Sequence, residues 1–367
     1  GMNKMKSFEE VFEDKTKYGT KIKTNEYQQE GKYLIVDQGQ EQVAGYTNLE
    51  EGVFEEVPAI VFGDHTRVIK YVEEPFFLGA DGVKVLKCRL PNANYKYLYY
   101  TLLNAKIPNT GYNRHFKWLK EIKIAYPNTE KQTEIVCILD KVSKIIEFRQ
   151  RQLKKLDELV KSRFIELFGT VKDNPYHFPT ATLKEVCHKI TDGKHGGCEQ
   201  ETDSGYYYVG AREIYDGVIH YDTAPQITFA DFAKDYRRCN IEQGDMVIVN
   251  TGATIGKSAI ASSHLTERTL LQKSVALIKV KTDVISAKFL RYCYMANPSM
   301  YMVESASAQP NLLLSKMNAT VIYLPPMELQ EQFAAFVEQT DKSKLAVKQS
   351  LEKLETLKKS LMQQYFG

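Results

Sequence analysis

Two long segments of the chain resemble each other. Residues 127–169 read PNTEKQTEIVCILDKVSKIIEFRQRQLKKLDELVKSRFIELFG, and residues 325–367 read PPMELQEQFAAFVEQTDKSKLAVKQSLEKLETLKKSLMQQYFG. They align without a gap at an offset of 198, and twelve of the 43 positions are identical. Average residue usage gives unrelated segments of this length only a few identities. The chain is therefore an internal duplication, in the order variable unit, helix, variable unit, helix.

Both repeated segments have the pattern of a long amphipathic helix. In the first, apolar residues recur in steps of four, three or seven and form a heptad seam, at positions 135, 139, 142, 146, 153, 156, 160 and 167. Thr129 and Glu130 supply a start signal and Gly169 a stop signal, with no proline between them. Forty residues make a helix of about 60 Å, which is longer than a small domain is wide.

A stripe this long needs a partner, and the other copy is the most economical one. The sequence predicts that the two helices pair antiparallel about a pseudo-two-fold axis. The alternative is that each helix packs only on its own domain. The residues predicted to pair the helices are Ile135, Leu139, Val142, Leu153, Leu156, Phe333, Val337, Leu351, Leu354 and Leu361.

The variable units are predicted to share one mixed fold of the α+β class. Short strands are predicted at 32–36, 59–62, 83–86, 245–249 and 274–280, and short helices at 98–103 and 289–295. The predicted organisation is domain 1 at 1–126, a spacer helix at 127–169, domain 2 at 170–325 and a second spacer helix at 326–367, with the domains separated by an antiparallel coiled coil.

Composition excludes several protein classes. The 367 residues are 43% apolar and 26% charged, unlike collagen, disordered or disulfide-rich chains. No apolar run is long enough to span a membrane. Gly1 ahead of Met2 is interpreted as a tag remnant, and no secretion signal is expected. Six scattered cysteines without a CxxC pair favour a reducing cytoplasm. A net charge of +3 permits a nucleic-acid partner without indicating one.

Motifs for catalysis are weak. Gly252-Ala-Thr-Ile-Gly256-Lys257-Ser258 has three residues between its glycines where a phosphate-binding loop needs four, so a turn between two strands is favoured. Cys187, His188, His195 and Cys198 lack paired zinc spacing, so no metal site is expected. No [Asp/Asn]-Pro-Pro-[Tyr/Phe] stretch encodes amino-methylation of bases, and no catalytic residues are assigned.

The organisation resembles the specificity subunit of Type I restriction-modification systems. The most specific features are the openings Tyr126-Pro127…Gln132 and Leu324-Pro-Pro-Met-Glu-Leu-Gln-Glu-Gln332, and the Lys-Ser…Phe-Gly helix endings. In domain 2, three loops look like recurrent family loops, namely Ile190-Thr-Asp-Gly-Lys-His195, Thr251-Gly-Ala-Thr-Ile-Gly-Lys257 and Ala308-Gln-Pro-Asn-Leu312. Their counterparts in domain 1, Gly63-Asp-His65 and Gly111-Tyr-Asn-Arg114, are looser matches.

The resemblance implies a non-catalytic subunit that reads DNA. Each domain would recognise one half of a split double-stranded target through base edges, and the helices would set the gap and dock two methyltransferase subunits. Endonuclease and translocase subunits would join for cleavage. No cofactor is expected in this chain, whereas S-adenosylmethionine, ATP and Mg are expected on the partners. Loop position and side-chain type predict DNA contacts from Lys194, His195, Arg212, Thr251, Thr254, Lys257, Asn311, His65, Arg67, Asn113 and Arg114.

Two other functions remain open from sequence alone. One is a helical scaffold whose domains bind proteins and no nucleic acid. The other is a stand-alone enzyme that uses the loop at Gly252 to bind a nucleotide.

Overall fold

The structure is a computed structural model that describes residues 4–302 and 311–367. The chain forms two compact units, each described here by itself. Unit 1 comprises residues 1–151 and 348–367, and unit 2 comprises residues 152–347. Each unit therefore holds one variable region together with a part of both long helices. The four-segment division expected from the sequence stays a prediction.

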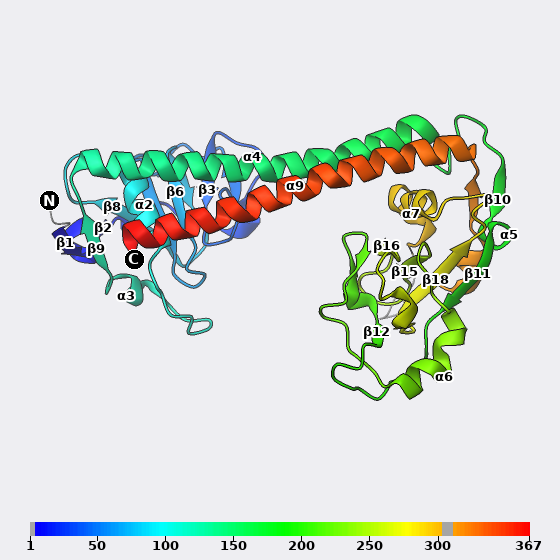
Figure 1. The fold of residues 1–367 in the computed structure, drawn as a ribbon. Coiled ribbons are helices and arrows are strands. Elements are labelled where there is room, and N and C mark those ends of the chain that lie inside the picture. The colour runs from blue at the N-terminus through cyan, green and yellow to red at the C-terminus, as the bar shows by residue number, and fades with distance from the viewer. Residues whose placement is uncertain (1–3, 303–310) are drawn as a thin grey trace. The chain divides into compact units, whose positions relative to one another are not determined.

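Unit 1 is built on a four-stranded antiparallel sheet in the order β2-β8-β5-β6 (Figure 1). A second sheet places β3 between β4 and a parallel β7, and β1 pairs with β9. The elements are β1 (Lys4–Ser7), α1 (Phe8–Val11), β2 (Phe12–Asp14), η1 (Thr16–Tyr18), η2 (Thr24–Glu26), β3 (Tyr33–Val36), β4 (Gly45–Thr47), β5 (Ala59–Gly63), β6 (Ile69–Val72), β7 (Phe76–Leu78), β8 (Val83–Cys88), α2 (Tyr95–Leu103), α3 (Phe116–Leu119) and β9 (Lys123–Tyr126).

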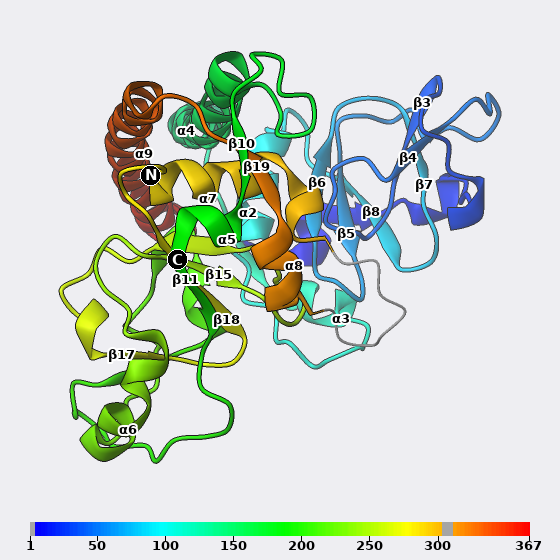
Figure 2. The same cartoon turned by 90° about the vertical axis from the view of Figure 1, so that its right-hand side faces the viewer.

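Unit 2 repeats this plan with a sheet in the order β11-β18-β15-β16. In Figure 2, β10 and β19 lie together beside α5 and α8. The elements are β10 (Thr180–Thr182), α5 (Leu183–Val186), β11 (Cys187–Asp192), β12 (Tyr207–Val209), η3 (Ala211–Glu213), β13 (Ile214–Tyr215), β14 (Val218–Ile219), α6 (Phe229–Cys239), β15 (Met246–Val249), β16 (Ser258–Ile260), η4 (Thr266–Arg268), β17 (Thr269–Leu271), β18 (Val275–Val280), α7 (Ala287–Ala296), η5 (Pro298–Met300), α8 (Leu314–Ala319) and β19 (Val321–Tyr323).

The main sheets of the two units correspond strand by strand, whereas β4 and the pair β13-β14 each belong to one unit only. The sheet order, the parallel pair β3-β7 or β12-β17, and the antiparallel pair β1-β9 or β10-β19 recur in chain order. The α+β fold class and the tandem duplication of one mixed fold are therefore confirmed. The strands and helices predicted from alternating and apolar runs are also present, with β5, β8, β15 and β18 at the predicted positions.

Matching local signals begin each unit. In unit 1, the hydroxyl of Ser7 accepts a hydrogen bond from the amide of Glu10, and the Glu10 carboxylate accepts one from the amide of Ser7. In unit 2, the Glu185 carboxylate accepts hydrogen bonds from both the amide and the hydroxyl of Thr182 at 2.7 Å. In both repeats, a glutamate three residues after the cap residue pairs the main-chain amide of that cap residue, and a one-turn helix forms at the same place.

The spacing between proline and glutamine is the same at the start of both long helices, and it has a structural cause. Gln132 and Gln330 are fully buried. The Gln132 side-chain amide donates to the carbonyl of Pro127 at 2.9 Å, and its oxygen accepts from the amide of Asn94 at 3.1 Å. Gln330 bonds in the same way to Pro325 at 2.9 Å and to Ser286 at 2.9 Å. Each glutamine thus ties the start of a long helix to the start of α2 or α7, because buried polar groups need partners.

The two long helices are α4 (Thr129–Phe168) and α9 (Met327–Phe366). The first ends at Gly169, whose φ of +68° is a left-handed conformation that glycine adopts without strain. In unit 1, the end of α9 packs on the start of α4, since Leu361 and Phe366 join the core that contains Leu139. This contact excludes the alternative in which each helix packs only on its own domain.

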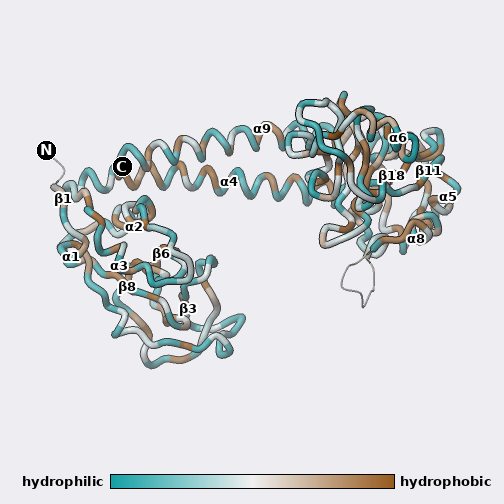
Figure 3. The backbone as a smooth tube through the Cα atoms, turned by 90° about the horizontal axis from the view of Figure 1, so that it is seen from below, coloured by the Kyte–Doolittle hydropathy of each residue, from teal (hydrophilic) through white to brown (hydrophobic). Residues whose placement is uncertain are grey.

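In unit 2, the start of α9 packs on the end of α4. Phe333 meets Phe164 with ring centroids 5.4 Å apart, and α7 contributes Phe289 to the same cluster. Lys344 of α9 forms an ion pair with Asp157 of α4 at 2.6 Å. Start meets end in both units, so the helices are antiparallel. Along both helices, hydrophobic and hydrophilic residues alternate, as Figure 3 shows.

The residues predicted to pair the helices occupy two kinds of position. The half-buried ones are Leu153, Leu156, Leu351, Leu354 and Leu361, of which Leu361 packs against the core of unit 1. The buried ones are Ile135, Leu139, Val142, Phe333 and Val337. Phe164 and Phe168 were not assigned to the seam, yet both are fully buried in the core of unit 2. The periodicity of a helix sequence identifies its apolar face, but it does not show which further residues of the helix will be buried against a domain.

Candidate nucleic-acid interface

In unit 2, loops distant in sequence meet at one end of the main sheet, around Lys273 and Ser274. The Lys273 amide donates to the carbonyl of Lys194 at 3.0 Å, and the Ser274 hydroxyl accepts from the amide of Ala211 at 3.3 Å. The Asn250 amide donates to the Ser274 carbonyl at 3.0 Å, and the Asn250 carbonyl accepts from Leu312 at 2.7 Å. The three predicted loops and the segment at Ala211 thus share one hydrogen-bonded platform.

Among the predicted DNA contacts, Thr251 and Asn311 are brought together directly. They pair as an isolated antiparallel bridge, and the Thr251 hydroxyl donates to the side-chain oxygen of Asn311 at 3.2 Å. Thr254 is half-buried in the same loop. Residues 308–310 of the predicted family loop lie outside the described residues, whereas Asn311 and Leu312 are described.

Two further predicted contacts have partners within unit 2. The ammonium group of Lys194 forms an ion pair with the carboxylate of Asp235 in α6, and its side chain is only 14% exposed. The ring of His195 stays exposed, with Nε2 at 3.0 Å from the Asp192 carboxylate, which also binds Arg238. A cation neutralised in this way attracts a phosphate less strongly, so the ion pair weakens the prediction that Lys194 contacts DNA.

Three exposed cations near the platform have no ion pair among the described residues: Arg212, Lys257 and Lys273. Sequence reasoning named the first two. It missed Lys273, since a single lysine between strands β17 and β18 carries no local signal, and only the fold places it at the centre of the converging loops.

The loop at Gly252 is a connection between strands. It joins β15 to the antiparallel β16, and Gly256, at φ +92°, lies so close to Tyr301 that a Cβ would come within 2.4 Å of its ring. A phosphate-binding loop leads into a helix instead. The interpretation as a turn between strands is confirmed, and this geometry gives no support to a nucleotide-hydrolysing enzyme.

In unit 1, the equivalent platform is anchored by Asp64, which is 4% exposed. Its carboxylate accepts a hydrogen bond from the amide of Phe116 at 2.7 Å, and its carbonyl accepts one from the amide of His115 at 2.8 Å. The ring of His115 is fully buried, and its Nδ1 lies 3.0 Å from the Asp64 carbonyl. These bonds hold the segment before α3 against the loop after β5.

The residues predicted to bind DNA in unit 1 gather on this platform. His65 Nδ1 lies 3.2 Å from the carbonyl of Asn113, and the exposed Arg114 follows it directly. Arg67 instead turns toward the chain, with its guanidinium donating to the carbonyl of Ile107 at 3.3 Å. Sequence reasoning missed Tyr112, whose ring stacks on His65 and is 87% exposed.

Metal-binding side chains and reactive thiols are two other features that could form a site in the described parts of the chain. No three metal-binding side chains converge there. Burial raises the pKa of the Cys187 thiol to about 12 and that of Cys239 to about 11, so both thiols are poor nucleophiles. No helix is long and apolar enough to cross a membrane among the residues searched.

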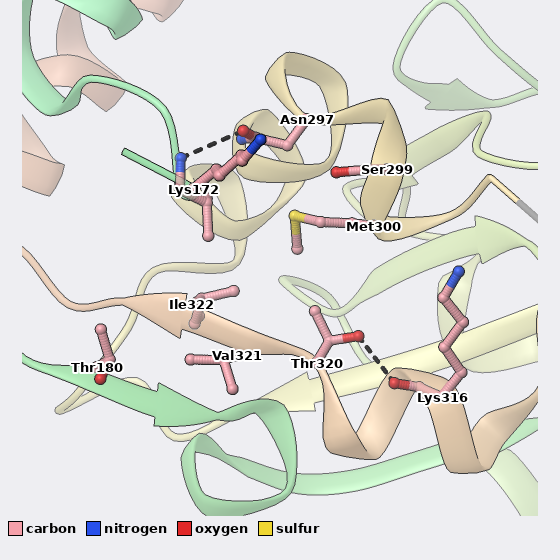
Figure 4. A pocket seen from close by; sticks show the side chains of 10 residues that line it. Lys172, Thr180, Asn297, Ser299, Met300, Lys316, Thr320, Val321 and Ile322 are labelled. Atoms are coloured by element: carbon pink, nitrogen blue, oxygen red, sulfur yellow. Dashed lines mark hydrogen bonds between the residues drawn. The ribbon is translucent and has the colours of Figure 1, made fainter. Parts of the chain in front are cut away.

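A pocket of about 370 Å³ lies in unit 2 between the segment after α4 and the elements η5, α8 and β19 (Figure 4). Val171 donates its amide to the side chain of Asn297 at 3.2 Å, and the Thr320 hydroxyl donates to the Lys316 carbonyl at 2.8 Å. These bonds join the elements around α8, and none of the predicted DNA contacts lines the pocket.

Comparison with known proteins decides the family. The model of the Type I restriction modification DNA specificity domain matches residues 2–158 and 176–357, which covers both repeats. The chain belongs to this family. Family membership assigns it a role in DNA recognition rather than in catalysis.

Relatives of this family include the specificity subunit of the Type I restriction enzyme EcoR124I/EcoR124II from Escherichia coli. It is 32% identical over 145 residues, and the match spans 35% of this chain and 35% of that protein, about a third of its length. The scaffold alternative is not favoured by these matches.

Solved structures of such subunits show the same fold. The Type I restriction-modification S subunit from M. genitalium is 17% identical, with a TM-score of 0.59 over 98% of this chain and 94% of that one. A chain from a study of complex assembly and conformational transition in the type I system is 15% identical. Its TM-score is 0.58 over 99% of this chain and 97% of the other.

Proposed function

We propose that this protein is the subunit of a Type I restriction-modification complex that recognises a bipartite duplex DNA target, with one unit reading each half. The observation that supports this most strongly is the repeated platform. The bridge between Thr251 and Asn311 in unit 2 has the same place in the fold as the contact between His65 and Asn113 in unit 1. One scaffold thus presents different side chains twice, as two unequal half-sites require.

The side chains on the two platforms suit DNA. The cations Arg114, Arg212, Lys257 and Lys273 are exposed and make no ion pair in the described chain, so they are available for phosphates. Amide and hydroxyl groups of Asn113, Asn311 and Thr251 are of the kind that reads base edges in the major groove. The individual contacts remain proposals.

The helices supply two matching points for a protein partner. Leu159 of α4, in unit 2, and Leu357 of α9, in unit 1, are the same residue of the repeat and are 49% and 47% exposed. Repeated exposed leucines at equivalent positions fit two copies of one partner, and we assign them to two methyltransferase subunits. We propose that the endonuclease and translocase subunits join this complex in the cytoplasm. S-adenosylmethionine, ATP and Mg are proposed to bind those partner subunits.

The recognition proposal is tested by domain exchange. Residues 1–139, which include domain 1 and its own anchor at Gln132, are replaced by the equivalent region of another family member, and the methylated motif is mapped in cells that carry the partner methyltransferase. The expected result is a change in one half of the motif while the other half and the gap stay the same. Replacing residues 170–337, which include the anchor at Gln330, is the matched experiment and should change the other half. A methylated motif that stays the same after both exchanges would contradict the proposal.

The docking proposal is tested by charge substitution. Leu159→Glu and Leu357→Glu are each expected to remove one methyltransferase copy, and the double variant should remove both. The mass of the purified complex measures this by light scattering. Leu49→Glu is the control, because Leu49 is 54% exposed and belongs to the loop after β4 in unit 1 rather than to either long helix. Retention of two copies by the double variant would rule out this docking surface.

A further inference from the structure

Tyr112 stands at the tip of the loop between α2 and α3 in unit 1. Its side chain is 87% exposed. An isolated exposed aromatic residue is common on protein surfaces and needs no explanation. Tyr112 differs because the structure holds its ring in one orientation on the platform that carries the predicted DNA contacts.

The ring of Tyr112 lies flat on the ring of His65. The two centroids are 4.8 Å apart and the planes differ by 9°. His65 is itself held, since its amide donates to the side-chain oxygen of Gln38 at 3.1 Å and its Nδ1 lies 3.2 Å from the Asn113 carbonyl. One face of the tyrosine is thus supported by a fixed histidine, and the other face is open to solvent.

The loop under Tyr112 is preorganised. Gly111 takes a φ of +77°, and its carbonyl accepts a hydrogen bond from the Asn113 amide at 2.9 Å. The side-chain amide of Asn113 donates to the Thr110 carbonyl, and buried His115 contacts Thr110 as well as Asp64. A tip that is already ordered loses little conformational entropy when it binds, so the ring can contribute most of its contact energy to affinity.

The surroundings of the ring carry positive charge. Arg114 is exposed and makes no ion pair among the described residues. Arg114 lies two residues after Tyr112 on the same loop. An open aromatic face beside a cation suits nucleic acid, where phosphate meets the cation and a base meets the ring.

We propose that Tyr112 is an aromatic wedge that contacts the face of a base in the half-site read by unit 1, at a base step that it partly unstacks. His65 is the positioning residue that holds the wedge. This inference rests on the proposed function, because it requires unit 1 to lie on DNA. The residue at the same repeat offset in unit 2 is Pro310, which has no aromatic ring, so the effect belongs to one half-site.

The test uses the full chain with its methyltransferase subunits and a series of duplexes that carry one abasic site at successive positions. An abasic site removes the cost of unstacking the base step at its position. The wild-type complex should therefore bind a duplex with an abasic site opposite Tyr112 at least about fivefold more tightly than the intact duplex. Tyr112→Ala should lose this gain and bind the intact duplex about tenfold more weakly, as expected when a base loses its aromatic partner. Tyr112→Phe and Tyr112→Trp should keep both properties.

Further variants separate a wedge from a structural residue. His65→Ala should lose part of the abasic gain, and His65→Phe, which restores a stacking ring, should recover it. Tyr176→Ala is the control, because Tyr176 is also an exposed tyrosine but follows α4 in unit 2 and lies away from the platform. Its binding should equal that of the wild type.

Two results would overturn the wedge. The first is that the Tyr112→Ala variant still binds DNA specifically and binds intact and abasic duplexes with the same affinities as the wild type. The second is that the Tyr112→Ala variant fails to assemble with the methyltransferase in the absence of DNA, because the ring would then be a contact with a protein. Failure of the proposed function is distinguishable, because the wild-type complex would then show no sequence-specific binding to any duplex.

Discussion

The platforms of units 1 and 2 share their backbone connections and differ in their side chains. Asp64 follows β5, and Asn250 follows the equivalent strand β15. The Asp64 carbonyl accepts a hydrogen bond from the segment ahead of α3, and the Asn250 carbonyl accepts one from the segment ahead of α8. The amides of these two residues donate to Gly82 and Ser274, which both precede the next central strand. Since main-chain groups hold the loops, the exposed side chains can diverge without loss of the fold.

The anchors themselves show how far the divergence has gone. The Asp64 carboxylate is bonded to a main-chain amide, whereas the side-chain oxygen of Asn250 has no hydrogen-bond partner among the described residues. Unit 1 adds an aromatic pair, and unit 2 adds the ion pair between Lys194 and Asp235. The same platform is therefore stabilised by different interactions in each half.

The largest expected difference lies in these anchors. Asp64→Ala removes a buried charge-assisted hydrogen bond and should lower the free energy of unfolding by about 2–3 kcal/mol. Asn250→Ala removes an acceptor that bonds to no described group and should cost less than about 1 kcal/mol. Denaturant unfolding of both variants measures the contrast, and equal losses would show that the two anchors work alike.

The buried glutamines should behave identically. Gln132→Leu and Gln330→Leu each leave a half-buried main-chain amide and a proline carbonyl without the glutamine as partner, so each should cost about 2 kcal/mol. Thermal unfolding compares them, with Gln339→Leu on the exposed surface of α9 as the control. A cost confined to one variant would show that the repeat is not preserved at the helix openings.

The helix seam offers another equal pair. Leu156→Asp and Leu354→Asp place a carboxylate at half-buried, equivalent positions, so each should cost about 1 kcal/mol and weaken complex assembly. Leu159→Asp is the matched control for stability, since Leu159 is exposed. Melting temperature and co-purification with the methyltransferase report the two effects. Unchanged values for both seam variants would argue against the helix pairing.

The smallest effect concerns single cations. Lys273→Met should weaken binding to all duplexes and reduce the slope of log affinity against log salt by about one, because one phosphate contact is lost. Lys194→Met should leave the slope unchanged, since Asp235 already neutralises that ammonium group. A reduced slope for Lys194→Met would restore it as a phosphate contact.

Much of the fold was predictable because its signals are local or repeated. Short apolar runs specified β5, β8, β15 and β18, and the heptads specified α4 and α9. The helix α6 was not predicted, although it supplies the partner of Lys194 from 41 residues away. Pairing over such a distance leaves no periodicity in the sequence.

The candidate interface was predictable in outline and not in detail. Loop motifs placed Thr251, Asn311 and His65 on the platforms. Tyr112 and Lys273 became candidates only because the sheet brings their loops beside the predicted contacts. Lys194 is neutralised by Asp235, which lies on the unpredicted helix α6. These are properties of three-dimensional packing, so a residue's type and its neighbours in sequence could not reveal them.

The buried amides at Gln132 and Gln330 also mark where this molecule can be cut and rejoined. A chimaera joined between Pro127 and Gln132 would take the anchoring side chain from one parent and its partner at Asn94 from another. A junction placed after Leu139 would keep each recognition region with its own anchor and with the first apolar turns of its helix. Exchange of DNA specificity between relatives should therefore succeed more often at the second kind of junction.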